Sequence, residues 1–406
     1  MADFARSTHP GVQAQLDRLD LLSPAGDRLG LERVGALLDR LGRPQEALPP
    51  VLHVAGTNGK GSTIAFLRAA LEAAGHKVHA FTSPHLVRFN ERIRIGGQLI
   101  DDETLAGLLT EVVNASGGIE PSFFEVATVV ALLAFARAPA DACLLEVGLG
   151  GRLDATNIID RPLVCGIASV GLDHQQFLGS SLAGIAAEKA AIAKPGVPLV
   201  SLAQVPEAEQ AIAAVASQIG TQLLAEGRDW QIDPTLVPKL DGYHQVRNAN
   251  LAWQMLKAQQ ALQVDRSAFL KGLRDARWPA RFEKLADGPL TAGVETWLDG
   301  AHNSDAARAL AATIDQRGPM HLVIGILANK DAEEIVGILA PHALSLTFVP
   351  VPDHAHQDPA ELARRFGGRA AAGVTEALSD LPGPRLIAGS LYLAGAVLAA
   401  NSQVPV

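Results

Sequence analysis

Positions 56 to 62 carry the residues with the clearest chemical meaning, a glycine-rich turn that includes a lysine and a hydroxyl. The turn reads Gly56-Thr57-Asn58-Gly59-Lys60-Gly61-Ser62. Glycines allow backbone N–H groups to close on phosphates, a following helix adds its positive N-terminal dipole, and a lysine supplies a mobile cation. The turn stands between the apolar run Val51–Ala55 and a helix-period segment, Thr63–Ala74. This order predicts that ATP or GTP binds here and leaves open what is done with it.

The spacing of this turn departs from the commonest P-loop. Only Thr57 and Asn58 separate Gly56 from Gly59, whereas the pattern G-x-x-x-x-G-K-[ST] has a longer gap. Lysine still stands at the start of the predicted helix, and the Ser62 hydroxyl suits a phosphate or its magnesium ion. We therefore keep the nucleotide-binding interpretation.

Ser83, Glu146 and His174 each stand at or just beyond the end of an apolar run that is predicted to be a strand. Taken singly, each has an ordinary explanation: a helix cap, a partner of a lysine, and a satisfied histidine. Carboxyl ends of parallel strands meet at one edge of a sheet, so we expect the three side chains to converge beside the glycine-rich turn. Such a sparse set of oxygen and imidazole ligands is typical of magnesium.

Three further groups complete the candidate site. The segment 148–157 is too glycine-rich and polar for a simple crossover, so we interpret it as a loop over the site, with Arg152 and Asp154 reaching inward. Lys189 follows on a predicted helix, where a solvated lysine is the ordinary alternative. Beyond a break near residue 279, polar groups again follow a strand; these candidates for a ribose, a base and a phosphate are Asp299, His302 and Arg281.

Alternating apolar runs and helix-period segments must position these residues, and they predict an α/β fold with mostly parallel, covered sheets. A chain of 406 residues exceeds a single core of roughly 250–300 residues. We expect an N-terminal P-loop ATPase-type domain, residues 1–279, and a smaller C-terminal α/β Rossmann-like domain, residues 280–406. The predicted strands are Val51–Ala55, Lys77–Thr82, Ala142–Val147, Leu163–Val170, Pro198–Leu202, Thr296–Leu298, His321–Ile326, Ser345–Phe348 and Arg385–Ala388. The predicted helices of the first domain are Thr63–Ala74, Asp102–Asn114, Phe124–Ala136 and Leu182–Ala193, after a helical prelude at 11–42.

Composition narrows the possible partners. Apolar residues make up 48% of the chain and charged residues 19%, which supports packed cores, and the net charge of −9 argues against a general nucleic-acid surface. The apolar segment 386–406 is interrupted by glycine, asparagine and proline, so we expect a buried helix there and no membrane span. No signal-like segment or disulfide framework is present in the sequence, and we expect a cytoplasmic protein.

Taken together, these motifs resemble the folylpolyglutamate synthase/dihydrofolate synthase family of the Mur ligase superfamily. They run in the family's order from about residue 27 to residue 395. The longest of them is Glu146 to Asn157, which reads Glu-Val-Gly-Leu-Gly-Gly-Arg-Leu-Asp-Ala-Thr-Asn. Other matching segments are Gly30–Val34, Val54–Ser62, Ser83–Arg88, Leu172–His174, Glu188–Ala190, His244-Gln245 with Asn248-Ala249, Arg281-Phe282, Asp299–Asn303 and Gly389–Tyr392.

The resemblance implies an ATP-dependent carboxylate–amine ligase whose larger domain binds ATP and whose smaller domain is the glutamate ligase domain. Its expected substrates are ATP, L-glutamate and dihydropteroate or a reduced folate, and its expected cofactors are two Mg²⁺ ions. A monomer is expected. The residues that it implies for ATP are Thr57, Asn58, Gly59, Lys60, Gly61, Ser62, Asn248, Arg281, Asp299 and His302. Those for metal are Ser83, Glu146, His174 and a carbamylated Lys189, and those for the pterin are Asp27, Leu29, Gly30, Ser122, Phe124, Arg152 and Asp154. Lys60, Lys189 and His174 are the expected catalytic residues.

Two other functions remain open at this point. A peptidoglycan-type Mur ligase shares the P-loop but carries a further N-terminal domain, and only 55 residues precede Gly56. A P-loop regulatory module would hydrolyse nucleotide slowly and need no second substrate. Within the family, the sequence does not distinguish a dihydrofolate synthase, a folylpolyglutamate synthase and a bifunctional enzyme.

Overall fold

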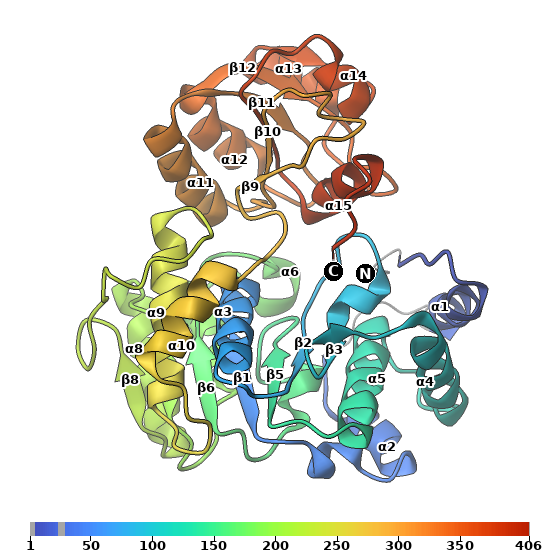
Figure 1. Cartoon of the computed structure of the whole chain (residues 1–406), viewed down its shortest axis with the longest axis vertical. Helices are drawn as coiled ribbons and strands as arrows, with labels where there is room; N and C mark the ends of the chain where they lie inside the picture. The colour runs from blue at the N-terminus through green and yellow to red at the C-terminus, as the bar shows by residue number, and fades with distance from the viewer. Residues whose placement is uncertain (1–4, 23–28, 406) are drawn as a thin grey trace. The chain divides into compact units, whose positions relative to one another are not determined.

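The computed structural model describes residues 5–22 and 29–405, and the chain divides into two compact units. Unit 1 comprises residues 1–239 and 246–276, and unit 2 comprises 240–245 and 277–406. The short segment 240–245 belongs to unit 2, although it was predicted to lie in the first domain. Both units alternate strands with helices, and Figure 1 labels most of these elements along the chain.

Unit 1 contains an eight-stranded sheet with the order β4-β3-β2-β5-β1-β6-β7-β8. The six strands from β2 to β8 in this order run parallel, while β3 and β4 form an antiparallel edge. The strands are β1 Val51–Ala55, β2 Val78–Phe81, β3 Ile93–Ile95, β4 Gln98–Leu99, β5 Ala142–Glu146, β6 Val164–Ile167, β7 Leu199–Ser201 and β8 Leu223–Ala225. The β3–β4 hairpin was not predicted, because its short strands lack a continuous apolar run.

The helices of unit 1 cover the sheet and supply its hydrophobic cores. They are α1 Pro10–Leu22, α2 Glu32–Arg40, α3 Lys60–Ala73, α4 Asp102–Ala115, α5 Phe123–Arg137, α6 Gln175–Leu178, α7 Leu182–Ala190, α8 Pro206–Ile219 and α10 Arg266–Asp275, together with α9 Tyr243–Lys257, which begins in segment 240–245. Short 3₁₀ turns are η1 Pro44–Ala47, η2 Phe89–Arg92 and η3 Ala155–Ile158.

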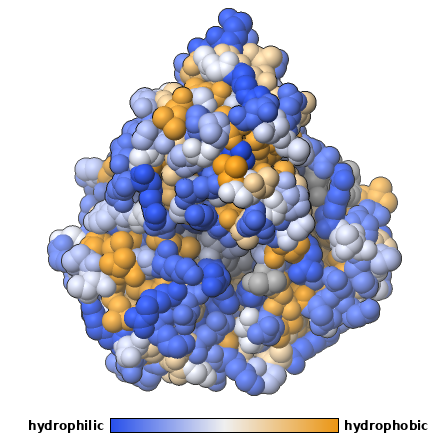
Figure 2. Space-filling view, turned by 45° about the horizontal axis from the view of Figure 1, so that its top comes forward, coloured by the Kyte–Doolittle hydropathy of each residue, from blue (hydrophilic) through white to orange (hydrophobic). Residues whose placement is uncertain are grey.

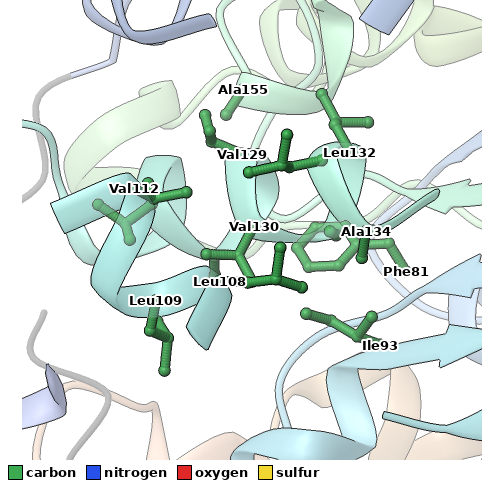
Figure 3. Packing of buried hydrophobic residues seen from close by; sticks show 14 of the residues in the cluster. Phe81, Ile93, Leu108, Leu109, Val112, Val129, Val130, Leu132, Ala134 and Ala155 are labelled. Atoms are coloured by element: carbon green, nitrogen blue, oxygen red, sulfur yellow. The ribbon is translucent and has the colours of Figure 1, made fainter. Parts of the chain in front are cut away.

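One core of unit 1 lies where α4 and α5 pack on the sheet. Helix α5 is apolar nearly all round, as expected for a helix with buried contacts on most sides. Its Val129 and Val130 lie among side chains of α4 and the strand residues Phe81 and Ile93 (Figure 3). A second core joins β1, β6 and β7 to α7 and α8. These cores hold α5 and α7, whose ends contribute to the candidate site.

Unit 2 contains a six-stranded sheet with the order β13-β12-β11-β14-β10-β9, which is parallel except for the edge strand β9. Its strands are β9 Glu283–Lys284, β10 Thr296–Leu298, β11 Met320–Ile324, β12 Ala343–Phe348, β13 Arg369–Ala370 and β14 Arg385–Ala388. Its helices are α11 Ser304–Arg317, α12 Ala332–Leu339, α13 Pro359–Phe366, α14 Val374–Ser379 and α15 Leu391–Ala400, with the 3₁₀ turn η4 Ala340–His342. The predicted α/β class with two parallel-dominated sheets is confirmed.

Helix α15 is the buried C-terminal helix expected from the apolar segment. Within residues 5–22 and 29–405, every helix is too short or too polar to cross a membrane. In the face drawn in Figure 2, hydrophilic residues alternate with smaller hydrophobic groups.

Candidate active site

The glycine-rich turn connects β1 to α3 and is held by the segment that follows β6. The backbone N–H groups of Thr57 and Asn58 donate to the Ser169 carbonyl, at 2.7 and 3.1 Å. The Thr57 hydroxyl donates to the carbonyl of Gly171 and accepts from its N–H, both at 3.0 Å. Helix α3 starts at Lys60, three residues earlier than predicted, so the lysine and Ser62 lie in its first turn.

Gly59 precedes α3 with a left-handed backbone, φ 91°, which favours glycine. The Asn248 side chain of α9 lies directly against it, since a Cβ at Gly59 would come within 2.4 Å of Asn248 Oδ1. The structure thus brings Asn248 to the turn as predicted, from a helix far along the chain.

Two lysines converge on one carbonyl of this turn. The Lys60 and Lys189 ammonium nitrogens donate to the Gly56 oxygen at 3.0 and 3.1 Å. Lys189, in the last turn of α7, is only 5% exposed. Burial lowers its pKa to about 7, and the positive charge of Lys60 adds to this, whereas Asp173 and Asp154 act in the opposite direction. The alternative of a solvated lysine is therefore wrong, and near neutral pH much of Lys189 is a neutral, nucleophilic amine.

Ser83, Glu146 and His174 lie at or beyond the carboxyl ends of β2, β5 and β6. β5 and β6 flank β1 in the sheet, and β2 is the next strand beyond β5. Glu146 pairs in register with Val54, and its buried Oε2 accepts from the Ser83 N–H at 3.2 Å. His174 opens α6 with a left-handed backbone, and its N–H donates to Asp173.

The predicted set thus reaches one sheet edge, as expected. In the described ranges no three His, Cys, Asp or Glu side chains gather as a metal site. The set contains only two such residues and the Ser83 hydroxyl. A buried carboxylate beside a hydroxyl suits a hard divalent cation. The ligand roles of Ser83, Glu146 and His174 stay predictions.

Glu91, which was not among the predicted site residues, organises the loop that carries Ser83. Its carboxylate accepts from the backbone N–H groups of Leu86, Val87 and Arg88, at 2.7–2.9 Å. Burial raises the pKa of Glu91, while these hydrogen bonds oppose the shift. Glu91 stands three residues after Arg88, the N-cap residue of η2, and this is the spacing of the glutamate in a capping box. That spacing is the signal that could have found it.

The segment 148–157, which we call the cover loop, is organised by Asp154. This side chain is 2% exposed and accepts from the amides of Gly148, Leu149 and Thr156 and from the Thr156 hydroxyl. Burial raises the pKa of Asp154, and the four hydrogen bonds oppose that change.

Arg152 is 56% exposed and pairs with Glu188 of α7, Nε to Oε1 at 2.8 Å. Asp154 is thus bonded within the loop and Arg152 lies at the surface. Asp154 is buried and its charge acts on Lys189, in agreement with the prediction that it reaches inward, whereas the prediction was wrong for Arg152. Their roles in binding a substrate stay predictions.

The residues predicted for the pterin lie partly outside the described ranges. Asp27 does so, while Leu29 and Gly30 begin the described segment before α2. Ser122 caps α5, its hydroxyl accepting from the Glu125 N–H. Phe124 lies against the cover loop, because a Cβ at Gly148 would come within 2.3 Å of its ring. Their pterin contacts stay predictions.

An ion pair with a buried carboxylate fixes this end of α5. Glu125, which also accepts from the Ser122 N–H, binds the Arg33 guanidinium of α2 through both oxygens, at 2.8 and 3.0 Å. The pair ties the starts of α2 and α5 together.

Unit 2 carries a separate polar group after β10. Asp299 is buried and accepts from the N–H groups of Phe282 and Ala301, each at 2.8 Å. Burial raises its pKa, whereas the charges of Arg281 and His302 act against this. Arg281 Nη1 donates to the Ala280 carbonyl, and His302 Nδ1 lies 2.8 Å from the Gly300 oxygen. The structure brings these three predicted residues together within unit 2; their nucleotide contacts stay predictions.

Comparison with known proteins agrees with this geometry. The family model for the Mur ligase glutamate ligase domain matches residues 280–383. A dihydrofolate synthase/folylpolyglutamate synthase of Bacillus subtilis is 34% identical over 80% of this chain and 81% of its own. A probable bifunctional folylpolyglutamate synthase/dihydropteroate synthase of Halobacterium salinarum is 35% identical over 90% of this chain, which spans about half (49%) of that relative's length.

Solved structures match over nearly the full length. FolC of E. coli in complex with DHPP and ADP has a TM-score of 0.85 at 31% identity, covering 97% of each chain. The bifunctional folylpolyglutamate synthase/dihydrofolate synthase of Yersinia pestis, complexed with AMPPNP and Mn, has a TM-score of 0.86 at 32% identity, covering 97% of this chain and 98% of its own. The resemblance inferred from the sequence is confirmed: this chain belongs to the dihydrofolate synthase/folylpolyglutamate synthase family of Mur ligases.

Proposed function

We propose that this chain uses ATP to join L-glutamate to the carboxylate of a pterin-bearing acceptor, either dihydropteroate or a reduced folate. The names of its relatives and the ligands in the solved structures of E. coli and Yersinia pestis support this. The observation that carries the proposal is the convergence of Lys60 and buried Lys189 on the Gly56 carbonyl. A nucleotide switch needs no second, partly neutral lysine at its phosphate loop.

A carboxylate is a poor electrophile, because its charge repels nucleophiles and it lacks a leaving group. In the proposed reaction a carboxylate oxygen of the acceptor attacks the γ-phosphorus, and the bond from that phosphorus to ADP breaks. The glutamate amine then attacks the carbonyl carbon of the acyl phosphate. Phosphate leaves with its oxygen, the nitrogen loses a proton, and an amide results.

The turn 56–62 would hold the phosphates, and Lys60 would stabilise the charge on the transferred group. Ser83, Glu146 and His174 would hold a magnesium ion, which when bound neutralises phosphate charge. The neutral amine of Lys189 would add carbon dioxide and lose a proton. This converts a cation into a carbamate anion that suits a second magnesium ion. In unit 2, Asp299, Arg281 and His302 would contact the nucleotide. We expect the enzyme to act as a monomer.

The test is release of ADP from purified protein that is given ATP, dihydropteroate and L-glutamate. We expect release to require both other substrates. ADP release without the acceptor and glutamate would contradict the proposal and favour the regulatory module. Mass spectrometry of the product, with dihydropteroate or tetrahydrofolate as acceptor, identifies which of the family's two reactions the enzyme performs.

A further inference from the structure

A buried histidine lies beneath the cover loop, at the centre of the sheet. His53 is the middle residue of β1, pairs in register with Leu145 and Cys165 of the neighbouring strands, and is fully buried. Its Nε2 lies 2.8 Å from Thr156 Oγ1, which in turn lies 2.5 Å from Asp154 Oδ1. Three polar side chains thus form a line from the sheet interior to the loop.

The positions of the protons in this line follow from what each group can donate. A hydroxyl has one proton, so if Thr156 donates to Asp154 its oxygen must accept from His53 Nε2–H. In the reverse direction Thr156 would donate to His53 Nε2 and accept from Asp154. Asp154 Oδ1, which already accepts from the Thr156 N–H, would then need a proton, and the imidazole proton would have to lie on Nδ1. Among the described residues Nδ1 has no hydrogen-bond partner. A buried N–H without an acceptor is costly, so the first direction is favoured.

The surroundings of His53 support a neutral ring. Burial lowers its pKa to about 3, and the charge of Lys194 adds to this. Lys194 lies at the other end of the cover loop, where its ammonium donates to the Asn157 carbonyl at 3.2 Å. A neutral imidazole with one proton can serve as the fixed donor that Thr156 requires.

At its other end, the line from His53 through Thr156 reaches Asp154, which holds the part of the cover loop closest to the proposed metal ligand Glu146. Asp154 Oδ2 accepts from the N–H groups of Gly148 and Leu149, at 3.0 and 2.8 Å. Gly148 comes two residues after Glu146, a proposed metal ligand, and lies against the Phe124 ring. A shift of these two amides would move the loop relative to both Glu146 and Phe124.

We propose that His53 is a positioning residue that, by donating to Thr156, fixes Asp154 and so the cover loop for the acceptor. The expected effect of His53 on catalysis rests on the proposed function, whereas its expected effect on the cover loop rests on the geometry alone. His53 touches no substrate in this account and acts through Thr156.

Two pairs of variants test the relay. His53→Leu and Thr156→Val remove a hydrogen-bonding group, while His53→Gln keeps a donor and Thr156→Ser keeps the hydroxyl. Native-state hydrogen exchange is measured at Gly148 and Leu149, with Leu144 and Leu145 of β5 as reporters of global unfolding. We expect the first pair to speed exchange at the loop amides about tenfold relative to β5, the size of one lost hydrogen bond. The conservative variants should restore most of the protection.

Combining His53→Leu with Thr156→Val should add little to either change, because both break the same line. The matched control is His79→Leu on β2, a buried histidine bonded to the backbone of Ala138 and Gly96. It should leave exchange at Gly148 and Leu149 unchanged relative to β5. Nitrogen NMR of labelled histidine should place the His53 proton on Nε2.

Kinetics connect the relay to the reaction. His53→Leu and Thr156→Val should raise the KM for dihydropteroate about tenfold and leave the KM for ATP unchanged. Unaltered exchange at the loop amides, or a proton on Nδ1, would overturn the relay. So would full additivity in the double variant. Lack of acceptor-dependent turnover in the wild-type enzyme would instead refute the proposed function, while the exchange data still decide the relay.

Discussion

Asp154 in unit 1 and Asp299 in unit 2 are buried carboxylates that hold a loop after a parallel strand, yet their surroundings differ. Burial raises the pKa of both. At Asp154 the opposing effect comes from hydrogen bonds that the cover loop itself supplies. At Asp299 it comes first from the charge of Arg281, then from the backbone hydrogen bonds of Phe282 and Ala301, and last from His302.

The difference shows that one sequence signal, an aspartate in a polar glycine-containing loop, serves two purposes. The four hydrogen bonds to Asp154 occupy its oxygens within the loop, so it acts through loop shape. Asp299 has the cationic guanidinium of Arg281 as a neighbour, which suits a site that must also meet a charged ligand. Variants can distinguish three contributions: the phosphate chemistry of Lys60 in unit 1, the shape of the cover loop held by Asp154, and the ligand contacts of Asp299 in unit 2.

The largest effect is expected from Lys60→Ala, which removes the cation at the phosphate turn of unit 1. We expect kcat to fall about 10²–10³-fold, as when a group that stabilises transition-state charge is lost. Steady-state ADP release measures this, and Lys257→Ala, at an exposed end of α9, is the control. Turnover close to wild type in a folded Lys60→Ala protein would contradict the assignment of the phosphate site.

Asp154→Asn and Asp299→Asn compare the two carboxylates directly. Each change places an amide NH₂ against backbone N–H donors. Asp154→Asn should lower the free energy of unfolding by about 2–4 kcal/mol, since it disturbs more hydrogen bonds, and Asp299→Asn by about 1–3 kcal/mol. Urea denaturation measures both.

Kinetics should separate the same two variants. We expect Asp154→Asn to raise the KM for the acceptor and Asp299→Asn to raise the KM for ATP. Equal effects of both variants on both KM values would remove the distinction between the carboxylates.

Gly148→Ala and Gly300→Ala probe how tightly each loop is packed. A Cβ at Gly148 would meet the rigid Phe124 ring at 2.3–2.8 Å, whereas one at Gly300 would meet the flexible ends of Leu391 and Arg281. We expect a loss of about 2 kcal/mol at Gly148 and about 1 kcal/mol at Gly300. Thermal unfolding measures the order, and the reverse order would show that the cover loop moves easily.

The smallest expected effect is the pH dependence of carbon dioxide uptake by Lys189. With a pKa of about 7, its neutral fraction rises about tenfold between pH 6 and pH 8. Carbon dioxide uptake in bicarbonate buffer, followed by mass spectrometry after trapping, should rise with the same midpoint. A midpoint near that of an ordinary lysine would contradict the buried, lowered pKa.

The same shift has a consequence for stability. Between pH 7 and 10.5 the unfolded chain binds more protons at Lys189 than the folded one. This group therefore favours folding increasingly as the pH rises through that window.

Much of this architecture was readable from the sequence, because continuous apolar runs mark buried parallel strands. The predicted strands at 51–55, 296–298 and 385–388 coincide with β1, β10 and β14. The topological rule that parallel strands end at one edge predicted the contact between Ser83 and Glu146, whereas the convergence of His174 on them stays a prediction. The switch of segment 240–245 to unit 2 has no local signal, since it depends on contacts distant in the chain.

The supports of the site were harder to predict. His53 and Thr156 act by bonding each other inside the protein, and such a contact leaves no spacing pattern in the sequence. Glu91 has only the weak signal of a capping-box spacing. The burial of Lys189 likewise depends on the packing of α7. Residues that would touch substrate were suggested by motifs, whereas those that hold the motifs in place required the structure.

The most direct test of the central claim follows one oxygen atom. Dihydropteroate labelled with a heavy oxygen isotope in its carboxylate is converted with ATP and L-glutamate, and the released phosphate is analysed by mass spectrometry. If a carboxylate oxygen attacks the γ-phosphorus, one labelled oxygen must appear in each phosphate that accompanies an amide product. Unlabelled phosphate formed together with the amide would contradict the acyl-phosphate route and with it the role assigned to the phosphate turn.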